Sequence, residues 1–67
     1  MRANYAEISW DAAKSQWLVR IESGEEVIRR HCKAAKDADE PSLRSMAERT
    51  LQDEGYELDP AQIRIRR

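Results

Sequence analysis

The sequence predicts a single small α+β domain, spanning residues 1–67, with the element order ββααβ. In this prediction a three-stranded antiparallel sheet carries two helices packed on one face. Three observations support it: the first third of the chain alternates apolar and polar residues around a short turn, the middle has helical spacing, and the end alternates again. Because each element has one apolar face, two helices over one side of a sheet bury all of these faces in one core.

Residues 5–22 are predicted to form a β-hairpin, because one loop length brings their apolar side chains to one face. With residues 12–15 as the loop, three apolar pairs share that face: Trp10 with Trp17, Ile8 with Val19, and Ala6 with Ile21. The opposite face then holds the remaining pairs: Ser9 with Leu18, Glu7 with Arg20, and Tyr5 with Glu22. A slip of one residue would place apolar side chains opposite polar ones, so the pattern also predicts the register.

Residues 23–38 could form a third strand or a helix. As a strand the segment alternates poorly, because Val27 and Ile28 are adjacent. At 100° per residue its apolar side chains gather on one side and its charged ones on the other. Ser23 and Glu26 also have the spacing of a capping box. We therefore favour a helix.

Residues 39–55 are predicted to contain the second helix. Asp39 and Pro41 are typical of a helix start, and an i, i+3, i+4, i+7, i+8 apolar stripe follows: Leu43, Met46, Ala47, Thr50 and Leu51. Gly55 suits the left-handed position that ends a helix, with Tyr56 contacting Leu51.

The last strand is predicted after Pro60, where Ile63 and Ile65 alternate with Arg64 and Arg66. The pattern leaves open whether this strand joins the sheet beside the first or the second strand. We favour the second, where it would run antiparallel.

Composition limits the functional classes. The chain is 37% charged, but its net charge is only −1, which argues against disorder and lowers the expectation of a dedicated nucleic-acid binder. The single cysteine, Cys32, cannot form an intramolecular disulfide. No apolar run reaches signal-peptide length near residue 1 or the ~20 residues of a membrane span. The sequence thus predicts a cytoplasmic protein.

Few residues carry reactive chemistry. His31 and Cys32 are the only nitrogen or sulfur ligands of the kind that zinc prefers, and a structural zinc site needs about four. As neighbours on a helix they would point about 100° apart, which also separates a nucleophile from its base. The carboxylates near the end of the second helix fit a solvated surface. We expect no catalytic residue, no cofactor or metal site, and no small-molecule substrate.

Two surfaces remain as candidate binding sites. The first is the sheet face opposite the helices, which would carry an aromatic residue, an exposed leucine and several arginines: Tyr5, Leu18, Arg20, Arg64 and Arg66. The second, an alternative basic face, lies on the outer side of the first predicted helix: Arg29, Arg30, Lys33 and Lys36.

These observations predict a non-catalytic interaction or regulatory protein, a small adaptor that acts through protein–protein contacts. Its partner would be another protein or a second copy of the chain in a homodimer, because the core is small and the sheet has open edges. The alternative is a nucleic-acid-binding accessory protein that uses the arginines of the sheet face or of the helix face.

Overall fold

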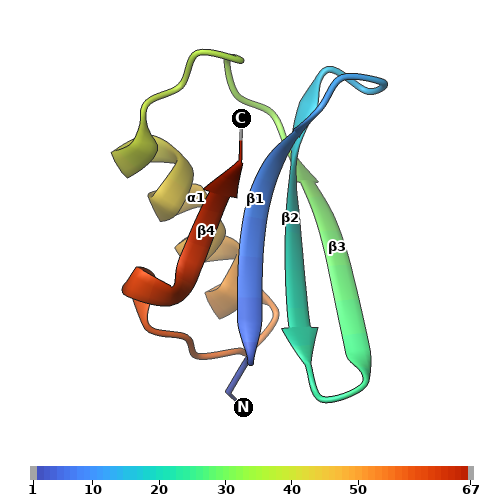
Figure 1. Cartoon of the computed structure of the whole chain (residues 1–67), viewed down its shortest axis with the longest axis vertical. Helices are drawn as coiled ribbons and strands as arrows, with labels where there is room; N and C mark the ends of the chain where they lie inside the picture. The colour runs from blue at the N-terminus through green and yellow to red at the C-terminus, as the bar shows by residue number, and fades with distance from the viewer. Residues whose placement is uncertain (1, 67) are drawn as a thin grey trace.

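The protein folds into a four-stranded mixed β-sheet with one α-helix on one of its faces (Figure 1). The computed structural model describes residues 2–66. In chain order the elements are β1 (Tyr5–Asp11), β2 (Gln16–Ser23), β3 (Glu26–Cys32), α1 (Glu40–Asp53), the 3-10 turn η1 (Pro60–Gln62) and β4 (Ile63–Arg66). The strands lie in the order β3-β2-β1-β4. The fold is α+β, as expected, but the ββααβ order with three strands and two helices is wrong.

The predicted hairpin is confirmed, including its register. β1 pairs antiparallel with β2 so that Trp10 lies opposite Trp17 and Asp11 opposite Gln16. The two indole rings meet edge to face with their centroids 5.4 Å apart. In the loop the Asp11 side chain accepts a hydrogen bond from the Ala13 amide at 3.1 Å, and Ser15 takes a left-handed φ of 53°. This side-chain bond holds the start of the turn that sets the register.

Residues 26–32 form the strand β3, so the helix expected over residues 23–38 is wrong. β3 pairs antiparallel with β2 and places Ile28 opposite Ile21 and Cys32 opposite Trp17. Ile28 and Cys32 pack against the core, whereas Val27 faces the other side of the sheet and is 44% exposed. The adjacent pair Val27–Ile28 is therefore compatible with a strand, because β3 is an edge strand that is buried only in part.

The turn between β2 and β3 explains why the strand forms. Ser23 pairs with Glu26, so only Gly24 and Glu25 lie between the strands. Gly24 has φ = 60°, which glycine adopts without a steric cost and which a tight type II′ hairpin turn requires at this position. Pairing with β2 satisfies the backbone groups of β3 that point inward, at Glu26, Ile28, Arg30 and Cys32, and covers an edge of β2 that a helix would have left bare.

The predicted start and end of α1 are confirmed. Asp39 is the N-cap, and its Oδ1 accepts a hydrogen bond from the Ser42 amide at 3.1 Å. At the other end Gly55 has φ = 83°, its amide donates to the Gln52 carbonyl at 3.0 Å, and the Tyr56 amide donates to the Leu51 carbonyl at 2.8 Å. These two bonds form a Schellman ending.

No helix within residues 2–66 has the length and apolar character that a membrane crossing requires.

β4 lies beside β1 and runs parallel to it, so the antiparallel position favoured beside the second strand is wrong. Ala6 pairs with Ile63, and Ile8 with Ile65. The physical reason is that β3 already occupies the free edge of β2, which leaves only the edge of β1. A parallel pair needs a crossover, and α1 supplies it by carrying the chain over one sheet face to the opposite edge (Figure 1).

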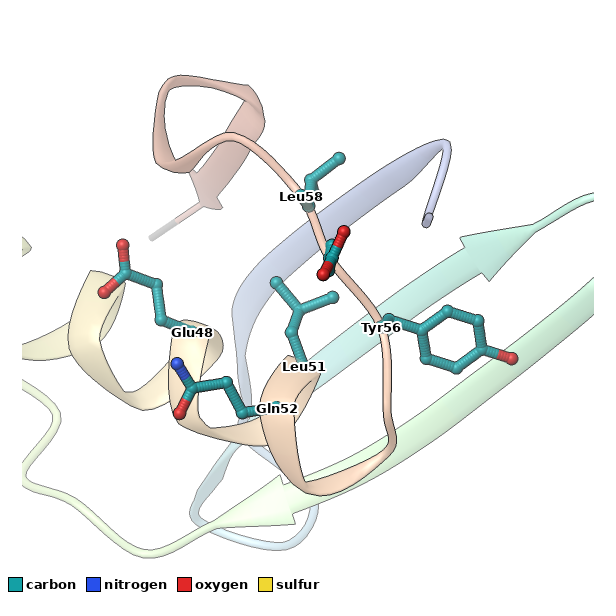
Figure 2. A pocket seen from close by; sticks show the side chains of 6 residues that line it. Glu48, Leu51, Gln52, Tyr56 and Leu58 are labelled. Atoms are coloured by element: carbon teal, nitrogen blue, oxygen red, sulfur yellow. The ribbon is translucent and has the colours of Figure 1, made fainter. Parts of the chain in front are cut away.

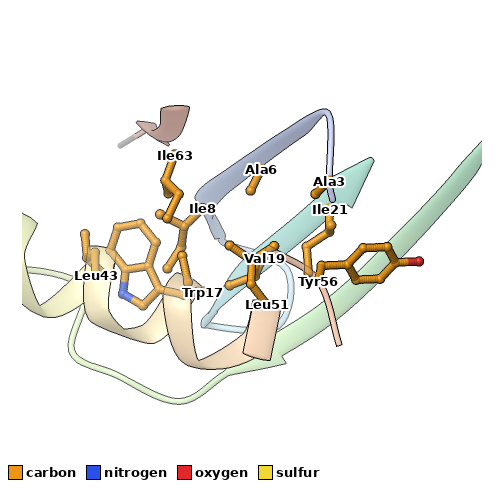
Figure 3. Close-up of a cluster of buried hydrophobic side chains, with 11 residues drawn as sticks. Ala3, Ala6, Ile8, Trp17, Val19, Ile21, Leu43, Leu51, Tyr56 and Ile63 are labelled. Carbon is orange, nitrogen blue, oxygen red and sulfur yellow. The ribbon is translucent and has the colours of Figure 1, made fainter. Parts of the chain in front are cut away.

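The core lies between α1 and the sheet (Figure 3). It is formed by buried side chains from every strand but β3, from α1 and from the segments next to them: Ala3, Ala6, Ile8, Trp17, Val19, Ile21, Leu43, Ala47, Leu51, Tyr56 and Ile63. Trp17 is fully buried, and its indole N–H donates to the Ala35 carbonyl at 2.9 Å. That bond fixes the segment joining β3 to α1 over the core. Within residues 2–66, no helix covers the other face of the sheet.

Candidate functional site

The candidate site is the open face, which we define as the sheet face that points away from α1. Strand alternation and the pairing register place these side chains on it: Tyr5, Glu7 and Ser9 from β1; Leu18, Arg20 and Glu22 from β2; Val27, Arg29 and His31 from β3; Arg64 and Arg66 from β4. All five residues predicted for a partner-binding face are among them. Because β3 is a strand, Arg29 and His31 join the same face.

Three arginines of the open face lie in one row across the sheet. Arg29 is opposite Arg20 on β2, Arg20 is opposite Glu7 on β1, and Glu7 is opposite Arg64 on β4. Strands are spaced by roughly 4.8 Å, so the row extends over about 14 Å. Arg66 belongs to the neighbouring row, beside Ser9, and is 75% exposed. The open face therefore presents four guanidinium groups, with Glu7 and Glu22 between them.

Tyr5 lies at the centre of these charges. The guanidinium carbons of Arg20 and Arg64 are 5.9 Å and 5.8 Å from its ring centroid, within cation–π range. The Tyr5 hydroxyl donates a hydrogen bond to Glu7. That bond to a carboxylate raises the pKa of Tyr5 above its usual value, with burial as the second cause. The hydroxyl therefore keeps its proton to a higher pH and donates it to Glu7, while the ring lies between two guanidinium groups.

Ion pairs engage Arg20 and Arg66 on the open face. Arg20 Nη2 lies 3.1 Å from Glu22 Oε2, and Arg66 Nη1 lies 3.8 Å from Glu7 Oε1. Arg20 remains 41% exposed in its pair. Ion pairs this exposed add little to stability. Their effect is to hold the guanidinium groups of Arg20 and Arg66 beside carboxylates of the same face.

The apolar part of the open face is smaller than expected. Leu18 is half-buried, and the row containing Arg20 and Glu7 separates it from Tyr5. The two therefore form no shared apolar patch. Among residues 2–66, Val27 is the most exposed large hydrophobic residue. It lies beside Glu22 at the β3 edge of the sheet.

The alternative basic face does not exist as one surface, because its residues do not share a helix. Arg29 points to the open face, whereas Arg30 points to the opposite face and pairs with Glu54 after α1. Lys33 lies beyond the end of β3. Lys36 is placed 6.0 Å from the Trp10 ring centroid. The predicted helix face is therefore absent, and a binding role for these four residues stays a prediction.

His31 and Cys32 are separated by strand geometry rather than by the helical angle expected from the sequence. His31 Nε2 lies 3.1 Å from Asp11 Oδ2 on the open face, and this bond lowers the pKa of Asp11. Cys32 is on the other face, with its Sγ 3.7 Å from Thr50 Oγ1. Within residues 2–66, no three His, Cys, Asp or Glu side chains gather as a metal site would require.

One shallow hollow lies on the helix side of the molecule and was not expected from the sequence. It has a volume of about 300 Å³ and is lined by residues of α1 and of the segment after it (Figure 2): Glu48, Leu51, Gln52, Tyr56, Glu57 and Leu58. The only sequence signal for it is an apolar residue, Leu58, shortly after the turn at Gly55, where the chain can fold back toward Leu51. The hollow is open and carries two carboxylates, so its charge is opposite to that of the open face.

Comparisons with protein-family models, with curated proteins and with solved structures gave no match for this chain.

Proposed function

We propose that this protein is a non-catalytic interaction domain that binds an acidic segment of a partner protein through the open face. The observation that carries the proposal is the row of arginines: Arg29, Arg20 and Arg64 project from three strands of a sheet face without a covering helix. Arginine is suited to this role, because its planar guanidinium offers paired donors to a carboxylate. A protein that binds a partner without catalysing a reaction on it would act as a regulator or an adaptor.

The charges within the open face favour a protein partner over a nucleic acid. Glu7 and Glu22 lie between the arginines and would repel a continuous phosphate backbone. The same carboxylates already bind Arg20 and Arg66 in the geometry that a partner's Asp or Glu would use. Discrete carboxylates, spaced along an acidic peptide, can pair with the arginines and avoid Glu7 and Glu22.

A cytoplasmic location belongs to the same proposal. It is supported by Cys32, which is a free, half-buried thiol. Thiols persist in reducing compartments, whereas oxidising ones favour disulfides.

The test compares two charge reversals that change the net charge equally. Arg64→Glu alters the open face, and Arg49→Glu alters an exposed arginine of α1. The probe is a fluorescein-labelled twelve-residue poly-glutamate peptide, followed by fluorescence anisotropy at low salt. We expect Arg64→Glu to weaken binding about 10-fold, which corresponds to ~1.4 kcal/mol, and Arg49→Glu to weaken it less than 2-fold. Equal losses, or no binding by the unmodified protein, would overturn the proposal.

Nucleic-acid binding is the second candidate, favoured by one observation. Tyr5 lies between Arg20 and Arg64, an arrangement that resembles the aromatic and cationic platforms on which bases stack. A single-stranded oligonucleotide tested against the same variants distinguishes the two. Binding tighter than that of the peptide, steeply weakened by salt and abolished by Tyr5→Ala, would favour this candidate and refute the acidic peptide.

A further inference from the structure

β3 presents a free backbone edge. Ser23 and Glu26 flank the two-residue turn and therefore exchange hydrogen bonds, as such pairs do in a tight hairpin. Bonding alternates along an antiparallel strand, so the N–H and C=O groups of Val27, Arg29 and His31 point away from β2. Within residues 2–66 no other group bonds to these backbone atoms. Six hydrogen-bonding groups are thus displayed along one straight strand.

The two edges of the sheet differ in how they are protected. β4 is four residues long, and the Ile63 carbonyl accepts a hydrogen bond from Arg44 Nη1 at 3.3 Å. β3 is seven residues long and pairs with β2 in continuous register, without a bulge or a proline. Natural edge strands are usually short, bulged, covered, interrupted by proline or protected by charged side chains. β3 has only the charges, Glu26, Arg29 and Arg30, and these exclude a strand of like charge but admit one whose charges are complementary.

We propose that the chain self-associates as a two-fold dimer in which β3 pairs antiparallel with β3 of a second copy, centred on Ile28. The inference goes beyond the proposed function, because it uses the edge of the sheet and not its open face. The partner is specified by β3's own charge pattern. β3 carries Glu26 near its start and Arg30 near its end, so an antiparallel copy meets it with opposite charges.

The register follows from the charges. Outward-pointing residues must face outward-pointing residues, which allows two-fold pairings centred on residues 27, 28, 29 or 30. Centring on Ile28 places Ile28 against itself, Glu26 opposite Arg30 twice, and Glu25 opposite His31. Centring on Arg29 or on Arg30 would place that arginine directly opposite its own copy, which is destabilising. Centring on Val27 shortens the paired segment and leaves Glu26 without an opposite charge.

The groups that would form the ion pairs are already held in place. The Tyr56 hydroxyl donates to Glu26 Oε2 at 3.3 Å, and Arg30 pairs with Glu54 on the same side of the sheet. Both side chains are exposed and keep donors or acceptors for the second copy. On the open face, Arg29 of the second copy would lie opposite Val27, whose exposed side chain it would cover.

Space above β3 permits the dimer. α1 packs mainly on β1, β2 and β4 (Figure 1), and it contacts β3 at Cys32, whose Sγ lies 3.7 Å from Thr50 Oγ1, so the outer edge of β3 is not covered by the helix. A two-fold axis perpendicular to the sheet would put both helices on one side, far apart, over a continuous eight-stranded sheet. The two open faces would then adjoin. A single strand pair buries little surface, so the expected dissociation constant is in the micromolar range.

The test uses Val27, because its side chain is exposed and makes no core contact. Val27→Glu would face Arg29 of the second copy and is expected to strengthen the dimer several-fold. Val27→Lys would face the same arginine and is expected to weaken the dimer at least 10-fold. Within one chain this lysine would lie beside Glu22, an opposite charge, so it should not destabilise the monomer. Dissociation constants are measured by sedimentation equilibrium of the full chain from 5 to 500 μM.

The controls are Ser45→Glu and Ser45→Lys, at an exposed position of α1, which should leave the association unchanged. A monomeric unmodified protein at 500 μM would overturn the proposal. Weakening by both Val27 variants would also overturn it, because that outcome indicates Val27 facing itself. If Val27→Lys is monomeric and binds the poly-glutamate peptide as before, dimerisation and the open-face function are separate properties.

Discussion

Replacement of Leu51 by alanine tests how much of the stability depends on the seam between α1 and the sheet. Leu51 is 2% exposed and lies at the last turn of α1, where its carbonyl accepts the Tyr56 amide at 2.8 Å. Truncating a buried leucine to alanine costs roughly 2–5 kcal/mol, depending on how far the site can collapse or fill. Leu51 also lines the open hollow (Figure 2), so neighbouring side chains and water can enter the space that the truncation leaves. We therefore expect a loss near the lower end, about 2–3 kcal/mol.

That loss is large for this chain. A domain of 67 residues has a free energy of unfolding of about 3–10 kcal/mol at typical per-residue stability. Urea denaturation followed by far-UV circular dichroism measures the change, with both proteins at one concentration so that self-association affects them equally. The midpoint should fall while the slope stays constant.

Gln52→Ala is the matched control, because Gln52 is exposed on the next position of the same helix and lines the same hollow. It should change the stability by less than about 0.5 kcal/mol. A loss below about 1 kcal/mol for Leu51→Ala, or an equal loss for Gln52→Ala, would refute the assignment of Leu51 to the core.

Two further predictions concern local features. Gly55→Ala should cost about 1 kcal/mol in urea denaturation, because an L-residue is strained at φ = 83°, and unchanged stability would contradict the left-handed helix ending. Asp11→Asn tests the bond to His31, which lowers the folded-state pKa of Asp11. A lowered folded-state pKa stabilises the protein above the unfolded-state pKa, about 3.9, and this contribution is lost as the pH falls through the folded-state value. The stability difference from the unmodified protein should therefore be present at pH 6 and shrink as the pH is lowered below about 4. A difference independent of pH would contradict this prediction.

The parts of the fold that could be predicted from the sequence are those where two independent signals coincide. In the β1–β2 hairpin, one loop length aligned Trp10 with Trp17 and also Glu7 with Arg20. In α1, the cap at Asp39 and the glycine at Gly55 bounded an apolar stripe of matching length. In both segments the local signals and the long-range packing favour the same structure, so either one was sufficient to predict it.

β3 could not be identified from periodicity, because an edge strand with one partly covered face has no clean alternation. Ile28 and Cys32 face the core, but Arg30 is on the same side and extends to Glu54 outside it. The spacing of these residues fits a helix almost as well. The missing signal was Gly24, which opens a two-residue turn and, once assigned, places Ile28 opposite Ile21.

The candidate site was predicted in part for a related reason. Tyr5, Arg20 and Arg64 share a face by strand parity alone, whichever strands are neighbours. Arg29 and His31 join them only when β3 is a strand. The basic helix face failed, because alternation sends Arg29 and Arg30 to opposite sides of the sheet.

The parallel pairing of β4 with β1 has a consequence for biosynthesis. Among the four strands, β1 is synthesised first and β4 last. β1 has both of its neighbours in the sheet only after Ile63 has paired with Ala6. While the chain is on the ribosome, the β1–β2–β3 meander can form, but its apolar underside stays bare until α1 and β4 have emerged. Contacts between the far ends of a chain are slow to form. The nascent meander is thus the stage of synthesis at which the apolar side chains of this core are most exposed.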